Sequence, residues 1–130
     1  MIRIGFIGCG SISHTHVMRL SLLQDGEAEI VGLCDVNLEN AKRLSKLVKK
    51  FRNISPRFPH EPSIFKEPVK MLETLDLDAV IVCTPHTLHY RHVMAALERN
   101  LHVLVEKPMA VNLKEVIEMR DEAESRGLRA

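Results

Sequence analysis

A glycine-rich segment near the N-terminus has the residue types that bind a phosphate group. It lies between an apolar run and a helical pattern, and it consists of Gly8, Cys9, Gly10, Ser11, Ile12 and Ser13. The first glycine permits a tight turn, and the second allows a phosphate to approach backbone N–H groups at a helix start. Ser13 occupies a position where Gly or Ala is usual, and so small a side chain should still pack. A glycine-rich turn can also lack any function, but its place between a strand and a helix favours phosphate binding by residues 8–12.

An acidic residue follows the second apolar run. Asp35 lies 25 residues after Gly10, and Asn37 comes shortly after it. The Asp35 carboxylate is placed to accept hydrogen bonds from the adenosine ribose and to repel a 2′-phosphate, so NAD is favoured over NADP. Lys42 and Arg43 could still steer a phosphate, and Asp35 could instead serve only as an acid near a helix N-terminus.

Two more polar segments follow apolar runs. One contains Thr84, Pro85, His86 and His89, and the other is Glu106-Lys107-Pro108. In a doubly wound sheet, the ends of these strands and the glycine loop line one crevice. Pro108 favours an extended Lys107, whose ammonium could polarise a substrate hydroxyl or carbonyl and ease proton loss. On residue type alone, a solvated Lys107 paired with Glu106 is the simpler interpretation.

The histidines suggest a metal site only superficially. His86, His89 and His92 recur every three residues, but such steps drift around a helix and do not bring three ring nitrogens together. We therefore predict no metal. His86 and His89 are expected to border the nicotinamide ribose, His92 to be solvated, and His16 to pack rather than act as a base.

The order of the apolar segments predicts the fold. Runs typical of strands buried on both faces cover Ile2–Ile7, Glu29–Cys34, Ala79–Cys83 and His102–Val105. Apolar residues at helical spacing lie between and after them, around His16–Leu23, Leu38–Phe51, Val93–Leu101 and Leu113–Ala123. This alternation predicts an α/β Rossmann fold, a doubly wound parallel sheet with helices on both faces.

Two segments depart from this alternation. The proline-rich stretch 52–68 is expected to be a loop with one weak edge strand at Ser63–Phe65. Gly127 would end the last helix, and Leu128–Ala130 resemble the start of another strand. We interpret residues 1–130 as one domain, next to which a further part is expected.

Composition excludes several classes of partner. The chain has 130 residues and a formal charge of +1, which provides no basic field for nucleic acid or anionic lipid. It contains no apolar run of the roughly 18 residues that a membrane span needs, and no secretory signal pattern. Three widely spaced cysteines are typical of buried reduced thiols. We expect a cytoplasmic location.

Taken together, these motifs resemble a known family. Gly8-x-Gly10 with His16, Cys34-Asp35-x-Asn37, Thr84-Pro85 with His89, and the run from His102 to Pro108 are similar to the N-terminal domain of the glucose-fructose oxidoreductase and inositol dehydrogenase family (Gfo/Idh/MocA). The resemblance covers nearly the whole chain, and the Glu-Lys-Pro element is its most specific part. His86 replaces the family's usual Asn, and Ser13 its usual Ala or Gly.

The resemblance implies an NAD(P)-dependent oxidoreductase acting on a sugar, cyclitol or related polyol. It implies that Lys107 contacts substrate and nicotinamide, and that a second domain, absent from this chain, supplies a catalytic Asp and His, binds substrate and forms any oligomer. Alone, the chain is therefore expected to be inactive. Two alternatives are a non-catalytic dinucleotide sensor, which would not need Lys107, and a glycosidase domain that uses transient oxidation by NAD.

Overall fold

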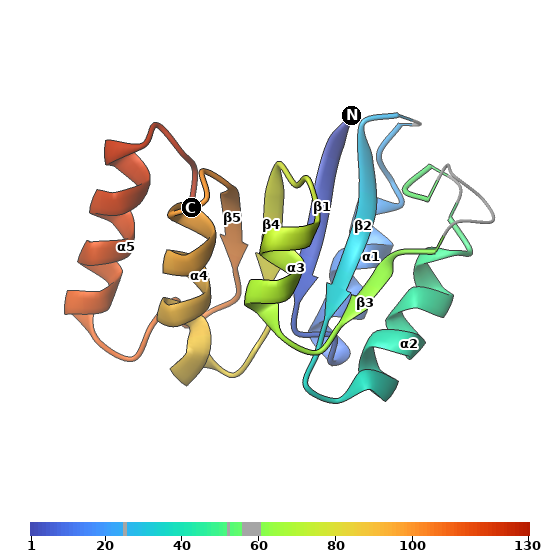
Figure 1. Cartoon of the computed structure of the whole chain (residues 1–130), viewed down its shortest axis with the longest axis horizontal. Coiled ribbons are helices and arrows are strands. Elements are labelled where there is room, and N and C mark those ends of the chain that lie inside the picture. The colour runs from blue at the N-terminus through green and yellow to red at the C-terminus, as the bar shows by residue number, and fades with distance from the viewer. Residues whose placement is uncertain (25, 52, 56–60) are drawn as a thin grey trace.

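Five parallel strands form the sheet that the apolar runs predict (Figure 1). The computed structural model describes residues 1–24, 26–51, 53–55 and 61–130. The strands are β1 Ile2–Ile7, β2 Ala28–Cys34, β3 Ser63–Phe65, β4 Ala79–Val82 and β5 His102–Val105. Their order in space is β3-β2-β1-β4-β5, so the sheet grows outwards in both directions from β1. The switch in direction between β1 and β4 is the place where ligands bind in open α/β sheets.

Helices connect the strands. They are α1 Ser11–Leu20, α2 Leu38–Val48, α3 Pro68–Thr74, α4 His89–Leu97 and α5 Leu113–Ser125, with a short 3-10 helix η1 at His86–Leu88. Asn37 and Asn112 cap α2 and α5, each accepting a hydrogen bond from a backbone N–H in the first turn. The sequence interpretation missed α3, because its seven residues span only two turns, although Pro68 at its start is a typical first residue.

The helices cover both faces of the sheet, which confirms the predicted fold class (Figure 1). On one face, α1 and α2 bury Val17 and Leu44 against Phe6. On the other face, α3, α4 and α5 form a second core that includes Leu97 and Met119. Packing in these two hydrophobic cores fixes the sheet, in which the carboxyl ends of the parallel strands lie along one edge.

Several element ends differ from the predictions: α1 ends at Leu20 rather than Leu23, and α4 ends at Leu97 rather than Leu101. Helix α2 ends at Val48 rather than at Phe51. No strand is formed at Leu128–Ala130, but the Arg129 carbonyl accepts a hydrogen bond from the Val103 N–H at 2.8 Å. That segment therefore lies along the outer edge of β5 without continuing the ladder. The predicted edge strand at Ser63–Phe65 is confirmed as β3, while residues 52 and 56–60 of the predicted loop lie outside the described residues.

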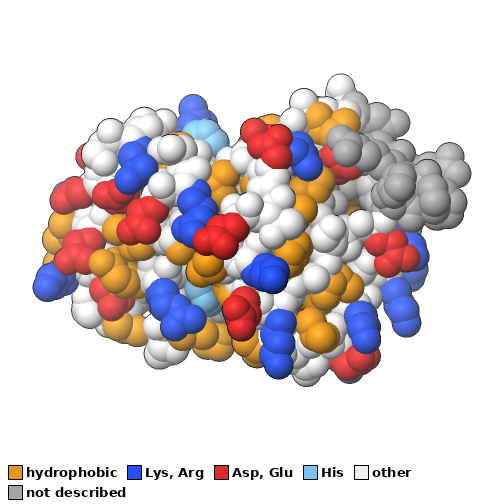
Figure 2. All heavy atoms as spheres, in the orientation of Figure 1, with side chains coloured by type: hydrophobic (Ala, Val, Ile, Leu, Met, Phe, Trp, Pro, Cys, Tyr) orange, Lys and Arg blue, Asp and Glu red, His pale blue; other side chains and the backbone are white. Residues whose placement is uncertain are grey.

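Charges of both signs are interspersed on the face of the molecule seen in Figure 2. This distribution fits a formal net charge of +1, which supplies no extended field of one sign. Among the described residues, no helix combines the length and apolar character needed to cross a membrane.

Candidate functional site

Gly8 brings the glycine loop against the end of β4. Its φ angle is +94°, and a Cβ added there would lie 2.6 Å from the carbonyl carbon of Cys83. Both the backbone conformation and the close approach therefore require glycine at this position. This confirms the tight turn predicted for the first glycine.

Gly10 shows a different reason for being glycine. Its φ angle is an ordinary −77°, and no neighbouring atom lies within 4 Å of a Cβ added there. The surrounding protein therefore leaves space that a side chain would fill. Gly10 also precedes α1, whose first turn has neither an acidic residue nor a capping side chain. Open space beside an uncapped helix start fits the pyrophosphate of a dinucleotide.

Ser13 is fully buried in the first turn of α1. Its hydroxyl donates a hydrogen bond to the Gly10 carbonyl. The extra oxygen is thus accommodated by the loop, as predicted for so small a side chain.

The Asp35 carboxylate joins the end of β2 to the glycine loop. Oδ2 accepts a hydrogen bond from the Cys9 N–H at 2.9 Å, and Oδ1 accepts one from the Asn37 N–H at 2.8 Å. Each carboxylate oxygen has a second lone-pair direction, so both can still accept from a ribose hydroxyl. Asp35 thus orders the turn before α2 and also faces the candidate site.

A cavity of about 420 Å³ lies at the carboxyl ends of β1, β2 and β4. The predicted residues that line it are Gly8, Gly10, Asp35, Asn37, Thr84 and Pro85. A groove of about 530 Å³ shares Gly10 and Asn40 with it and adds Cys9 and Ser11. The two hollows run along the glycine loop, in the place where the sequence predicts a dinucleotide.

Other predicted residues lie outside the lining of these two hollows. They are Ile12, His86, His89, Glu106 and Lys107. Conversely, Asn40, Arg43, Lys66 and Arg91 line them and were not predicted as site residues. The sequence does indicate Arg43 as a residue that could steer a phosphate. Lys66 follows β3 and Arg91 lies on α4, and no recognisable motif marks either position.

Glu106 and Lys107 follow β5 at the same edge of the sheet. The Glu106 N–H donates to the Val82 carbonyl at 3.0 Å, which fixes Glu106 beside the end of β4. Its Oε1 lies 2.6 Å from His16 Nε2, and its Oε2 accepts from the Lys107 N–H at 3.3 Å. The carboxylate therefore pairs with His16 rather than with the Lys107 ammonium. The hydrogen bond from His16 holds the pKa of Glu106 below its usual value.

The three evenly spaced histidines point to different partners. His89 is 1% exposed, and its two ring nitrogens lie 2.7 Å from the Thr84 carbonyl and 2.8 Å from the Pro108 carbonyl. His92 is 5% exposed and contacts the Thr84 hydroxyl at 3.1 Å, so the expectation that it is solvated was wrong. It lies on the inner face of α4. His86 is exposed.

The cysteines near the glycine loop are free thiols. Cys9 and Cys34 are buried, and Cys83 is partly buried. Burial raises the pKa of Cys34 and Cys83 to about 12 and that of Cys9 further, so all three are protonated at neutral pH. Protonated thiols are poor nucleophiles and metal ligands, which leaves them packing roles beside the site.

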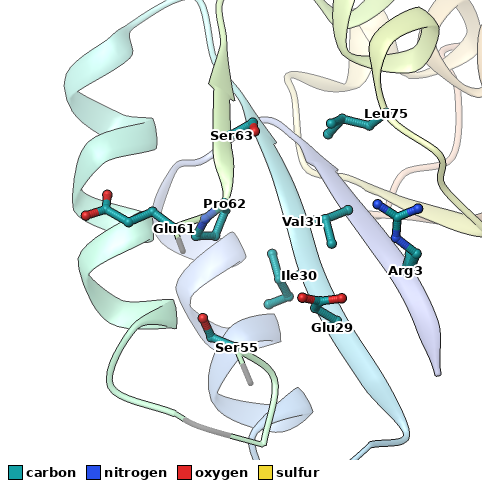
Figure 3. Close-up of a pocket in the computed structure, with 9 residues that line it drawn as sticks. All are labelled: Arg3, Glu29, Ile30, Val31, Ser55, Glu61, Pro62, Ser63 and Leu75. Carbon is teal, nitrogen blue, oxygen red and sulfur yellow. The ribbon is translucent and has the colours of Figure 1, made fainter. Parts of the chain in front are cut away.

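A separate cavity of about 360 Å³ lies at the amino ends of β1, β2 and β3 (Figure 3). Arg3 and Glu29 are register partners on β1 and β2, and both line it. The Arg3 guanidinium pairs with Asp76 at 2.8 Å. This cavity is at the opposite edge of the sheet from the glycine loop.

Comparison with known proteins agrees with this geometry. Residues 2–130 match the model of an oxidoreductase family with an NAD-binding Rossmann fold, GFO_IDH_MocA. Glucose-6-phosphate 3-dehydrogenase of Bacillus subtilis is 35% identical over 100% of this chain and 33% of its own length. Glycosyl hydrolase family 109 protein 1 of Akkermansia muciniphila is 36% identical over 95% of this chain and 25% of its own length.

A solved structure extends the likeness to three dimensions. The WlbA dehydrogenase of Bordetella pertussis, crystallised with NADH and UDP-GlcNAcA, superposes with a TM-score of 0.82. It is 28% identical, and the match covers 98% of this chain and 36% of that one. The chain thus spans about a third or less of the length of the relatives that it matches.

Proposed function

The chain belongs to the GFO_IDH_MocA oxidoreductase family, which has an NAD-binding Rossmann fold, and from this membership we propose that it binds NAD and presents Lys107 to a sugar, cyclitol or related polyol. The observation that carries the proposal is the convergence of the glycine loop, Asp35 and the segments after β4 and β5 at one edge of the sheet.

Each part of this edge has a separate task. The backbone N–H groups around Gly10 hold the pyrophosphate, in space that no protein atom fills. Asp35 accepts hydrogen bonds from the adenosine ribose and disfavours a 2′-phosphate. NAD, when bound, supplies the hydride acceptor. Lys107 holds a positive charge near the substrate hydroxyl, which favours loss of the hydroxyl proton as the hydride leaves the adjacent carbon.

The substrate class is proposed from the relatives. The Bacillus subtilis relative is named for oxidising a sugar phosphate, and the Bordetella pertussis structure holds a nucleotide sugar. We propose that substrate contacts and the remaining catalytic groups come from residues that this chain does not contain. On this proposal the chain alone binds the cofactor but does not turn over substrate.

One other reaction has specific support. The Akkermansia muciniphila relative is named as a glycosyl hydrolase, and glycoside cleavage through transient oxidation would use the same domain. The two reactions differ in their products: cleavage releases the leaving group without net NADH, whereas a dehydrogenase accumulates NADH in proportion to substrate oxidised. A non-catalytic sensor is disfavoured by the presence of Lys107.

The position of Lys107 can be tested by chemical labelling of the chain. Lysine amines are methylated with formaldehyde and cyanoborohydride, and the extent at Lys107 is read by mass spectrometry with and without ligand. Saturating NADH should slow the labelling of Lys107, while ADP-ribose, which lacks the nicotinamide, should not. Lys50 is an exposed control beyond the far end of α2, a helix about 16 Å long.

Equal labelling of Lys107 with and without bound NADH would contradict the proposed role. Equal protection by ADP-ribose would place the lysine at the wrong end of the cofactor.

A further inference from the structure

Glu106 connects Lys107 to the helix that follows the glycine loop. His16 lies in the second turn of α1 and is 90 residues away from Glu106 in sequence. The two side chains are 13% and 21% exposed, and their contact is 2.6 Å long. The second oxygen of the same carboxylate accepts from the backbone N–H of Lys107. One carboxylate thus links α1 to the lysine backbone.

The other side of Lys107 is also held by an imidazole. The carbonyl of Pro108 lies 2.8 Å from His89 Nδ1, and the second ring nitrogen reaches the Thr84 carbonyl. His89 is buried and begins α4, so this side of the segment is anchored to the turn that follows β4. The residues before and after Lys107 are therefore fixed to two different elements, while the lysine side chain itself is exposed.

The hydrogen bond from His16 stabilises the ionised form of the Glu106 carboxylate. Because the pKa of Glu106 is below its usual value, the carboxylate is ionised at neutral pH and accepts hydrogen bonds from both His16 and the Lys107 backbone. A hydrogen bond to a charged partner is stronger and shorter than one between neutral groups. With both side chains mostly shielded from water, this contact is also more rigid than the exposed ion pairs on the surface.

We propose that His16 is a positioning residue, which holds Glu106 against α1 and thereby fixes Lys107 at the nicotinamide end of the cofactor. The inference rests on the proposed function, because it is the role of Lys107 that His16 serves. It assigns His16 neither proton transfer nor contact with the pyrophosphate. It also predicts that the glycine-loop helix and the lysine segment move as one unit.

The test compares two ligands in the unsubstituted chain and in three variants. NADH reaches Lys107, whereas ADP-ribose retains the adenosine, pyrophosphate and second ribose but lacks the nicotinamide. His16→Ala should weaken NADH binding about fivefold or more and leave ADP-ribose affinity within about twofold. His16→Gln should restore NADH affinity, because its amide N–H can still donate to Glu106. Glu106→Leu, which removes both acceptor oxygens at similar size, should show the same selective loss as His16→Ala.

A purely structural role for His16 predicts a different pattern. Equal weakening of NADH and ADP-ribose would mean that His16 supports the glycine loop in general, and would overturn the inference. Unchanged affinity for both ligands would overturn it as well. If His16→Ala does not fold, Glu106→Leu and His16→Gln decide the question by the same comparison.

Labelling of Lys107 separates this inference from the proposed function. In the unsubstituted chain, NADH protection of Lys107 reports on the proposed function alone. If that protection is present, His16→Ala at saturating NADH should lose most of it, while Lys50 labelling stays constant. Protection that persists undiminished in His16→Ala would overturn the positioning role and leave the proposed function standing.

Discussion

Both oxygens of the Asp35 carboxylate accept a backbone hydrogen bond before any ligand binds. One bond comes from the glycine loop and the other from the residue that caps α2. This arrangement fixes the position of the negative charge relative to the loop. A fixed charge discriminates between ligands better than a mobile one, because neither ligand can be accommodated by moving the side chain away. Asp35 is therefore the residue on which cofactor preference should depend.

His92 should make folding sensitive to mild acid. Burial, together with the positive charge of Arg91 and the neighbouring imidazole of His89, lowers its pKa from the usual 6.5 to about 4. Between those pH values the unfolded chain binds a proton that the folded chain does not, so stability falls as pH drops from about 6.5 towards 4. The difference in pKa corresponds to a loss on the order of 3 kcal/mol. Urea unfolding at several pH values measures it.

The matched variants for this prediction are His92→Gln and His86→Gln. The first removes the buried imidazole and should flatten the profile between pH 6.5 and 5, whereas the second replaces an exposed histidine and should leave it unchanged. Glu106 acts at lower pH: since its folded pKa is depressed, its contribution is lost only as pH falls below its usual 4.5. An equally steep profile in His92→Gln would contradict the assignment to His92.

At the scale of elements, the two glycines in the turn from β1 to α1 have different roles. We expect Gly8 to be needed for folding and Gly10 for cofactor binding. Gly8→Ala should lower the Tm, because φ is +94° and the new Cβ would collide with the end of β4. The conformational term alone is about 1–2 kcal/mol, and each kcal/mol shifts the Tm by roughly 4 °C in a domain of this length. Gly10→Val should keep the Tm within a few degrees but weaken NADH binding about tenfold or more.

Thermal melts and NADH titrations of both variants check this pair. Thr74→Val, at the exposed end of α3, controls for the effect of a solvent-exposed valine outside the lining of the cavity. A Gly10→Val chain that binds NADH as well as the unsubstituted chain would show that the space beside Gly10 is not used by the cofactor.

Local patterns predicted most of these elements. The strands could be recognised because each is a short, nearly continuous apolar run between polar residues, and the parallel, doubly wound class of the sheet followed from the alternation with helices. Helix α3 is too short to show a period. The segment Leu128–Ala130 has the composition of a strand but lies beside β5 with only one ladder-like hydrogen bond, a feature of tertiary position.

Local sequence patterns also predicted only part of the candidate site. Gly8, Gly10 and Asp35 could be predicted because their spacing from a strand end is fixed by the fold. The contact between His16 and Glu106 joins residues 90 positions apart, so no local pattern reveals it. The burial of His92 depends on which face of α4 meets the sheet, and a spacing of three residues leaves that face undetermined. Arg91 and Lys66 reach the cavity only because α4 and β3 flank it.

At the scale of the whole molecule, the site is made by topology rather than by net charge. The chain has a formal charge of only +1, and charges of both signs share the surface shown in Figure 2. On the proposed function, an anionic ligand is recognised by the local arrangement at the switch between β1 and β4, and not by a long-range field. We expect the fixed negative charge of Asp35 to decide which dinucleotide is preferred.

The most direct test of the central claim is a titration of the chain with NADH and with NADPH. Nicotinamide fluorescence is a convenient signal, because the chain contains no tryptophan. We predict saturable binding of NADH, about tenfold or more tighter than NADPH, with the difference largely lost in Asp35→Asn. A folded sample, verified by circular dichroism, that shows no saturable binding of either dinucleotide would contradict the claim.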